Sequence, residues 1–287
     1  MGEALALASA LCFGVTHFVN GLVSRRMDGI TVALYAQLGG TVVALWLAMS
    51  SSGGVGTACD YGFGALSGVG TGVGVAFLYR AMSQGQMSVV VPVSDVGAVA
   101  LPVLVGVAFL GERPATVAWV GIAAAVPALW LVSQASGPGP RPGRGRGTGS
   151  PVTAGVPAAL AASTCFGVQF LAMAQVGADG GLWPVVVSRI ASLLVITAVL
   201  VLFRSPATMP GRLTAVACAA GAVGTVAIIL YLAATRHQLM AVATVLSALY
   251  PAIPVLLALV FLHERLTRWQ TAGLVCAAAA IALIALR

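Results

Sequence analysis

Long apolar runs, separated by short polar or Gly- and Pro-rich breaks, make up nearly the whole chain. A helix needs about 20 mostly apolar residues to cross the hydrocarbon core of a bilayer, and the runs have about that length. The breaks predict transmembrane helices at residues 4–22, 30–49, 61–81, 88–110, 115–133, 153–175, 182–203, 213–234, 241–262 and 269–286. The pattern therefore predicts an all-α integral membrane protein with ten transmembrane helices.

One break differs from the others in composition. Residues 133–151 read SQASGPGPRPGRGRGTGSP. A stretch of Ser, Gly, Pro and Arg cannot bury a core, so we expect a flexible linker. Five predicted spans precede it and five follow it. We therefore divide the chain into a first repeat at 1–133, a linker at 134–151 and a second repeat at 152–287.

The two halves repeat one another in sequence. The tetrapeptide CFGV at 12–15 recurs at 165–168, and FLGERPATVAWVG at 109–121 matches FLHERLTRWQTAG at 261–273 with an offset of 152. Because each half has an odd number of predicted spans, the second half starts on the opposite side of the membrane. The repeats are therefore predicted to be inverted, which is typical of secondary transporters with a binding site between the repeats.

Composition and charge narrow the class of protein. Hydrophobic residues make up 60% of the chain and charged residues 7%, against about 25% charged residues in soluble domains. The net charge of +7 comes from 14 basic residues, all arginine, scattered between apolar runs. Such arginines anchor loops at a membrane surface, so we expect no nucleic-acid partner. The five cysteines lack metal-ligand spacing, and we expect neither a metal site nor a disulfide framework.

A motif near the end of each half resembles a known family. A Pro lies within the fourth span of each half, Leu-x-Glu-Arg ends that span, and a Gly lies in the fifth; the residues are Pro102, Glu112, Arg113 and Gly121, and Pro254, Glu264, Arg265 and Gly273. In this pattern the chain resembles EamA-type proteins of the drug/metabolite transporter (DMT) superfamily. The resemblance implies two five-helix repeats in the bacterial inner membrane. It also implies transport of small organic solutes and cytoplasmic termini.

The arginines do not agree with that orientation. With cytoplasmic termini, Arg113, Arg236 and Arg287 lie inside. The arginines then outside are Arg25, Arg26, Arg80, Arg141, Arg144, Arg146, Arg204, Arg212, Arg265 and Arg268. Cytoplasmic loops normally carry the excess of positive charge. Ten spans put both termini on one side, and the sequence leaves open which side this is.

Two ionisable residues lie inside predicted spans. Arg189, in the seventh span, would cost about 2.5–3.5 kcal/mol near the bilayer centre on insertion scales. We interpret it as an anion- or carboxylate-binding group in the transport cavity; the alternative is pairing with a structural acid or snorkelling to an interface. Asp95, in the fourth span, is interpreted as a proton acceptor that couples transport to a proton gradient. A structural hydrogen bond is the alternative.

Other polar residues are candidates for the same cavity. His17, in the first span, is a candidate proton switch or a hydrogen-bonded packing residue. With a rise of about 1.5 Å per residue, His17 and Asp95 lie about 10 Å from one membrane face and Arg189 about 12 Å from the other. Asn20 and Gln169 place amides on one face of their helices, either toward the cavity or in helix–helix hydrogen bonds.

Aromatic and acidic residues complete the predicted site. Tyr250 is assigned to an apolar wall of the cavity, with core packing as the alternative. Tyr231 lies near a span end, where aromatic belts occur. Glu112 and Glu264 follow the ends of long apolar runs and are interpreted as turn and capping groups, not as substrate ligands. The glycines of 64–77 permit close helix contacts, and no Walker lysine accompanies them, so no nucleotide cofactor is expected.

These observations favour a secondary transporter, an exporter of small organic metabolites or drugs that works by alternating access. An uptake permease of the same fold is the first alternative. An integral-membrane lipid enzyme would need clustered catalytic groups, whereas the three His and seven acidic residues are dispersed. A non-transporting scaffold is a third alternative. The expected partners are the solute and the lipid bilayer, with the chain as a monomer or homodimer and without a cofactor.

Overall fold

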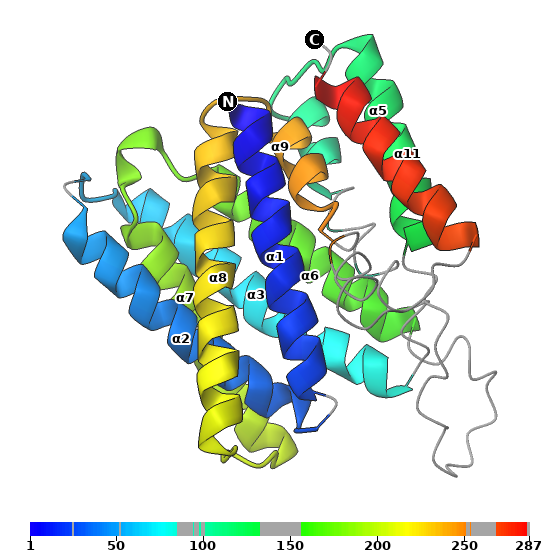
Figure 1. Cartoon of the computed structure of the whole chain (residues 1–287). Helices are drawn as coiled ribbons and strands as arrows, with labels where there is room; N and C mark the ends of the chain where they lie inside the picture. The colour runs from blue at the N-terminus through cyan, green and yellow to red at the C-terminus, as the bar shows by residue number, and fades with distance from the viewer. Residues whose placement is uncertain are drawn as a thin grey trace.

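The computed structural model describes residues 1–24, 26–51, 53–84, 94, 98, 101–132, 156–250, 253 and 268–285. Regular structure in these residues is helical (Figure 1). The helices are α1 (Gly2–Ser24), α2 (Gly29–Ser50), α3 (Ala58–Gln84), α5 (Thr116–Val132), α6 (Val156–Ala174), α7 (Trp183–Phe203), α8 (Gly211–Thr235), α9 (Met240–Ser247) and α11 (Arg268–Ala285), with a short 3₁₀ helix at Ala178–Gly180. Residues 101–108 are also helical.

Five of the described helices are long and apolar enough to cross a membrane, namely α1, α2, α3, α7 and α8. Their outer faces expose large apolar side chains such as Trp46 (66% exposed) and Leu194 (66% exposed), which a bilayer would cover. The chain is therefore an integral membrane protein. Parts of the predicted spans 88–110 and 241–262, and the whole predicted linker, lie outside the described residues, so the count of ten spans stays a prediction.

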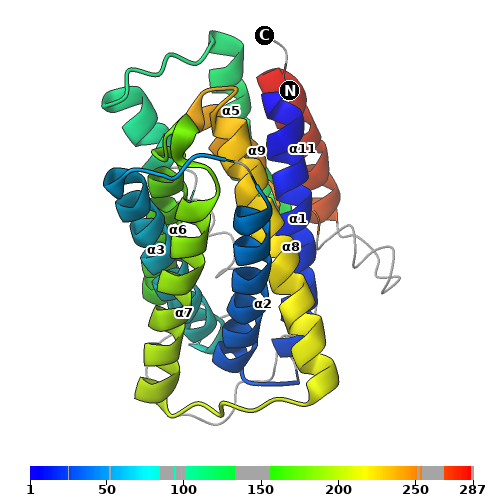
Figure 2. The same ribbon diagram turned by 90° about the vertical axis from the view of Figure 1, so that its left-hand side faces the viewer.

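The helices of the two halves are interleaved. Helix α1 packs on α8 of the other half, and α6 packs on α3 of the other half. Helix α2 contacts both α7 and α8, and α7 also contacts α3; Figure 2 shows α2 between α7 and α8. These contacts order six helices as α1, α8, α2, α7, α3 and α6. Helix α9 packs against α1, while α5 and α11 pack on each other.

Glycines let the interleaved helices approach closely. A Cβ atom on Gly221 of α8 would overlap the backbone oxygen of Ala36 on α2. A Cβ atom on Gly68 of α3 would overlap the backbone oxygen of Ser188 on α7. Ala36 and Ser188 are 152 positions apart, which is the offset between the repeats. The two helix pairs therefore pack in matching ways, with small residues at the contact as is usual in membranes.

The described core surrounds α9. All eight residues of α9 are buried, and Tyr231 of α8 is fully buried beside it. The Tyr231 hydroxyl donates to the backbone oxygen of Phe170 at 3.1 Å and lies 2.9 Å from the Thr244 hydroxyl. The predicted place of Tyr231 in an aromatic belt is thus wrong. The turn of α8 that carries Tyr231 lies near the end of the apolar run, but α6 and α9 pack around it.

The two ends of the described chain lie together. Helix α1 begins, and α11 ends, at the same end of the helical bundle in both views (Figures 1 and 2).

Candidate functional site

A buried pair of polar side chains joins α2 to α7. Helix α7 carries Arg189, whose side chain is only 7% exposed, and α2 carries Gln37, which is 8% exposed. Nη1 of Arg189 donates a hydrogen bond of 3.1 Å to Oε1 of Gln37. The backbone oxygen of Gln37 accepts a bond of 2.7 Å from the Thr41 hydroxyl one turn later. The guanidinium group thus lies inside the bundle, held by an amide of the other half.

The charge of Arg189 is not balanced by an acid in the part of the chain that the structure describes. The single ion pair found there joins the N-terminal amino group to Glu3 at 3.6 Å. Nε of Arg189 is buried and has no hydrogen-bond partner among these residues. Asp95, the predicted proton acceptor, lies outside the described residues. A buried charge without a charged partner is costly, so this group is a strong candidate for ligand binding.

The partners in this pair occupy equivalent positions of the two repeats. Gln37 and Arg189 are separated by 152 residues, the same offset that relates Glu112 to Glu264. Sequence reasoning singled out Arg189 and missed Gln37, because a neutral amide in an apolar helix is not a rare feature. The repeat offset is the signal in the sequence that points to Gln37.

A second group of predicted residues is aromatic. The rings of His17 on α1 and Tyr250, which follows α9, stack with centroids 4.8 Å apart and planes inclined by 21°. Phe13 lies one turn earlier on α1, with its centroid 6.1 Å from that of Tyr250. Asn20 is buried one turn after His17, and its Oδ1 has no hydrogen-bond partner within the described residues. His17 and Tyr250 are therefore neighbours, and Asn20 lies one turn along the same helix.

The predicted depths of His17, Asp95 and Arg189 in the membrane do not by themselves show that these residues lie together. The described contacts join His17 to Tyr250 and Arg189 to Gln37, and they form two separate groups. Because Asp95 lies outside the described residues, a common cavity for His17, Asp95 and Arg189 stays a prediction.

Gln169 and its repeat mate Thr16 take part in helix–helix hydrogen bonds. The Thr16 hydroxyl on α1 donates to the backbone oxygen of Ala220 on α8 at 3.0 Å. In the matching helix pair, the Thr71 hydroxyl on α3 donates to Oε1 of Gln169 on α6 at 2.8 Å. These bonds correspond to the helix–helix alternative for Gln169. A role of Gln169 in a transport cavity stays a prediction.

Glu112 connects the family motif of the first half to a helix of the second half. Its carboxylate accepts hydrogen bonds from the backbone N–H groups of Met240 and Ala241, the first two residues of α9. It is thus a capping group, as the sequence suggested, for a helix distant in sequence. Gly106 makes room for it, since a Cβ atom there would lie 2.5 Å from Oε2 of Glu112. Gly111, at φ 69°, provides the left-handed turn before Glu112.

The structure describes two further residues of the repeat motif. Arg113 is exposed, and Pro102 is buried within the helical residues 101–108. Pro254, Glu264 and Arg265 lie outside the described residues. No group of three or more His, Cys, Asp or Glu side chains that could hold a metal ion occurs in the described part.

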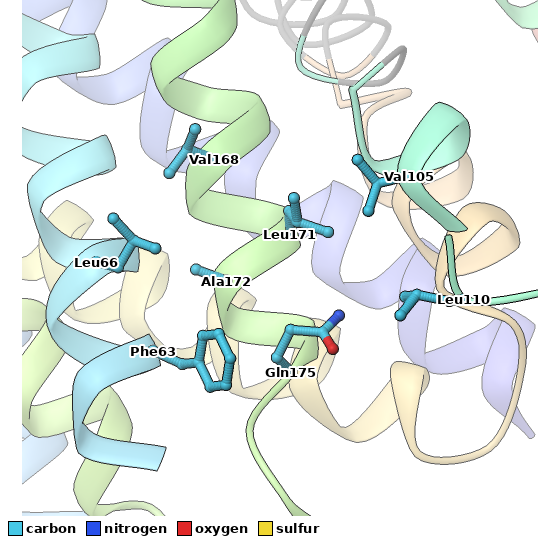
Figure 3. Close-up of a pocket in the computed structure, with 8 residues that line it drawn as sticks. All are labelled: Phe63, Leu66, Val105, Leu110, Val168, Leu171, Ala172 and Gln175. Carbon is cyan, nitrogen blue, oxygen red and sulfur yellow. The ribbon is translucent and has the colours of Figure 1, made fainter. Parts of the chain in front are cut away.

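A mostly apolar pocket of about 370 Å³ lies between α3, α6 and the segment 101–110 (Figure 3). One side is formed by side chains of α3 and α6 and the other by Val105 and Leu110, with the amide of Gln175 as its polar group. The lining residues are Phe63, Leu66, Val105, Leu110, Val168, Leu171, Ala172 and Gln175. None of the predicted site residues within the described part of the chain lines this pocket.

Comparisons with known proteins agree with this architecture. The EamA-like transporter family matches residues 1–134 and 153–286. A solved structure described only as "Crystal structure of protein" aligns with a TM-score of 0.73 over 99% of this chain and 96% of that chain. The identity is 18%, so this likeness concerns the fold alone. No curated protein matches the sequence.

Proposed function

Because the chain belongs to the EamA-like transporter family, we propose that it is a secondary transporter that exports small organic metabolites or drugs. It works by alternating access between two inverted five-helix repeats, with the solute bound where the repeats meet. The observation that carries this proposal is the buried Gln37–Arg189 pair, which joins equivalent positions of the two halves.

The interleaved packing supports a mechanism based on relative movement of the halves. Helices α1 and α6 each pack on a helix of the opposite half, so a shift of one half changes both contacts together. Such contacts suit rocking about a fixed central site, which is the usual mechanism of transporters built from repeats. The close glycine contacts at Gly68 and Gly221 present smooth helix surfaces on which such a movement can occur.

The predicted cavity residues have the following roles in the proposed transport cycle. Arg189 binds the solute, and His17, Asn20, Gln169 and Tyr250 line its cavity. Asp95 binds a proton, whose gradient drives transport.

We propose that the protein lies in the bacterial inner membrane with both termini on the cytoplasmic side, as a monomer or homodimer. The start of α1 and the end of α11 at one end of the bundle support a common side for the termini.

Solute flux in vesicles tests the proposal. The purified full-length protein is reconstituted into liposomes loaded with radiolabelled amino acids, nucleobases, organic acids or organic cations, one class at a time. We expect exchange of at least one class at rates well above those of protein-free liposomes. Absence of exchange for every class would instead favour the scaffold or lipid-enzyme alternative. Uptake without efflux in oriented vesicles would favour the permease.

A further inference from the structure

The guanidinium group of Arg189 has more hydrogen-bonding capacity than the described residues use. Arginine carries five N–H donors in a planar fork. Gln37 accepts one of them at 3.1 Å, and Nε–H is left buried without a partner in this part of the chain. The fork matches the two oxygens of a carboxylate, which can accept two parallel hydrogen bonds from it. The remaining donors therefore favour an oxyanion ligand.

Charge favours an anion more strongly than a neutral ligand. Gln37 gives Arg189 a hydrogen bond and no negative charge, so within the described residues the cation remains uncompensated in a setting of low dielectric constant. The attraction between opposite charges is many times stronger there than in water. An amide of the same shape as a carboxylate would gain hydrogen bonds and leave the charge unbalanced. The site should therefore distinguish an acid from its amide.

The amount of charge selects the kind of anion. Among the described helices, Arg189 lies six residues after the first residue of α7, whereas Arg80, Arg204, Arg212 and Arg236 lie closer to helix ends. A carboxylate balances one positive charge. A phosphate group, which carries about −1.5 to −2 charges at pH 7, would leave a surplus of buried negative charge. One arginine at this depth thus fits a monovalent oxyanion better.

We infer that Arg189 and Gln37 together bind the carboxylate of a small organic acid at the junction of the two repeats. The inference rests on the proposed transport function and names its substrate class. In this arrangement Gln37 positions the guanidinium group through its Oε1, and its amide N–H groups donate to the second carboxylate oxygen. Ser192, one turn after Arg189, is 1% exposed, and its hydroxyl has no partner within the described residues. It is a further unpaired donor on the same helix, among the described residues.

The position of the pair gives the experiment a matched control. Arg189→Gln produces two glutamines at equivalent positions and removes the charge. The double variant Gln37→Arg with Arg189→Gln moves the charge to the other half and keeps both side-chain types. If the charge at the junction is what binds the acid, the double variant regains binding that Arg189→Gln lacks. It also keeps the test valid if Arg189→Gln alone is unstable.

Thermal unfolding of the full-length protein in neutral detergent provides the readout. Acetate, lactate and benzoate are compared at equal ionic strength with acetamide, lactamide and benzamide, with inorganic phosphate, and with phosphatidylglycerol in the micelles. A ligand of the folded state raises Tm by mass action. We expect at least one carboxylate to raise Tm by about 2 °C or more, in the wild type and the double variant, with no shift in Arg189→Gln.

Several outcomes would overturn the inference: no response to any carboxylate, an equal response to the amides, a response retained in Arg189→Gln, or stabilisation by phosphate or the lipid alone. Flux measurements separate this inference from the proposed function. Carboxylates that bind through Arg189 and are not exchanged by liposomes would refute transport and leave the binding site. Exchange of cations or neutral solutes that is unchanged in Arg189→Gln would refute the carboxylate site and leave transport.

Discussion

Gln37 and Arg189 hydrogen-bond to each other at 3.1 Å although they occupy the same position in the two halves of the chain. Equivalent residues of a repeat can touch only where the two copies meet about their common axis. A position that differs in charge between the copies thus lies at the place that both halves share. A substitution of Gln37 or Arg189 therefore acts directly on the contact between the two halves.

Replacement of Arg189 by alanine should abolish transport without preventing membrane insertion. We expect flux in proteoliposomes to fall at least tenfold, because the variant loses the buried cation that binds the solute; a lost charge-assisted hydrogen bond corresponds to about 1.5–3 kcal/mol. Leu194→Ala on the same helix, at a side chain that is 66% exposed, is the control and should retain flux. Unchanged flux in Arg189→Ala would remove Arg189 from the site.

Replacement of Asp95 by asparagine should uncouple transport from the proton gradient. The amide keeps the size of the carboxyl group and cannot take up a proton, so flux should no longer depend on an imposed pH difference. Flux is compared with and without the pH difference in wild type and variant. A variant that keeps the full dependence would show that Asp95 has a structural role.

Loss of the Glu112 carboxylate should destabilise α9. Glu112→Ala leaves the N–H groups of Met240 and Ala241 without their acceptor, and loss of a helix cap costs about 0.5–2 kcal/mol. We expect a lower Tm in detergent. The neighbouring Arg113→Ala, at an exposed side chain, should change Tm much less. Equal Tm values for both variants would mean that the cap contributes nothing to stability.

A methyl group at Gly68 should disturb the contact between α3 and α7. In Gly68→Ala the new Cβ overlaps the backbone oxygen of Ser188, and such overpacking typically costs about 1–3 kcal/mol. We expect a lower Tm and lower flux. Gly62→Ala lies on the same helix, where a Cβ atom meets no atom within 4 Å, and should leave Tm unchanged or raise it. A tolerated Gly68→Ala would argue against tight packing there.

The apolar runs predicted the described helices to within a few residues at most ends, because burial in lipid demands long, uniformly apolar segments. Arg189 was found because a charge in such a segment is rare. Gln37 was missed because its importance comes from its partner. The pairing of Glu112 with α9 joins residues 128 positions apart, and no local pattern specifies which helix end an acid caps. Tyr231 was misplaced because distance from a span end does not show which neighbours surround a side chain.

The interleaved packing has a consequence for how the chain is held together. Helix α1 contacts α8, and α6 contacts α3, so each half finds much of its packing surface on the other half. The two halves then resemble a heterodimer whose subunits share one polypeptide. On this view the segment between them serves to raise the local concentration of one half around the other. Co-expressed as separate fragments, the halves should assemble in the membrane without a covalent connection.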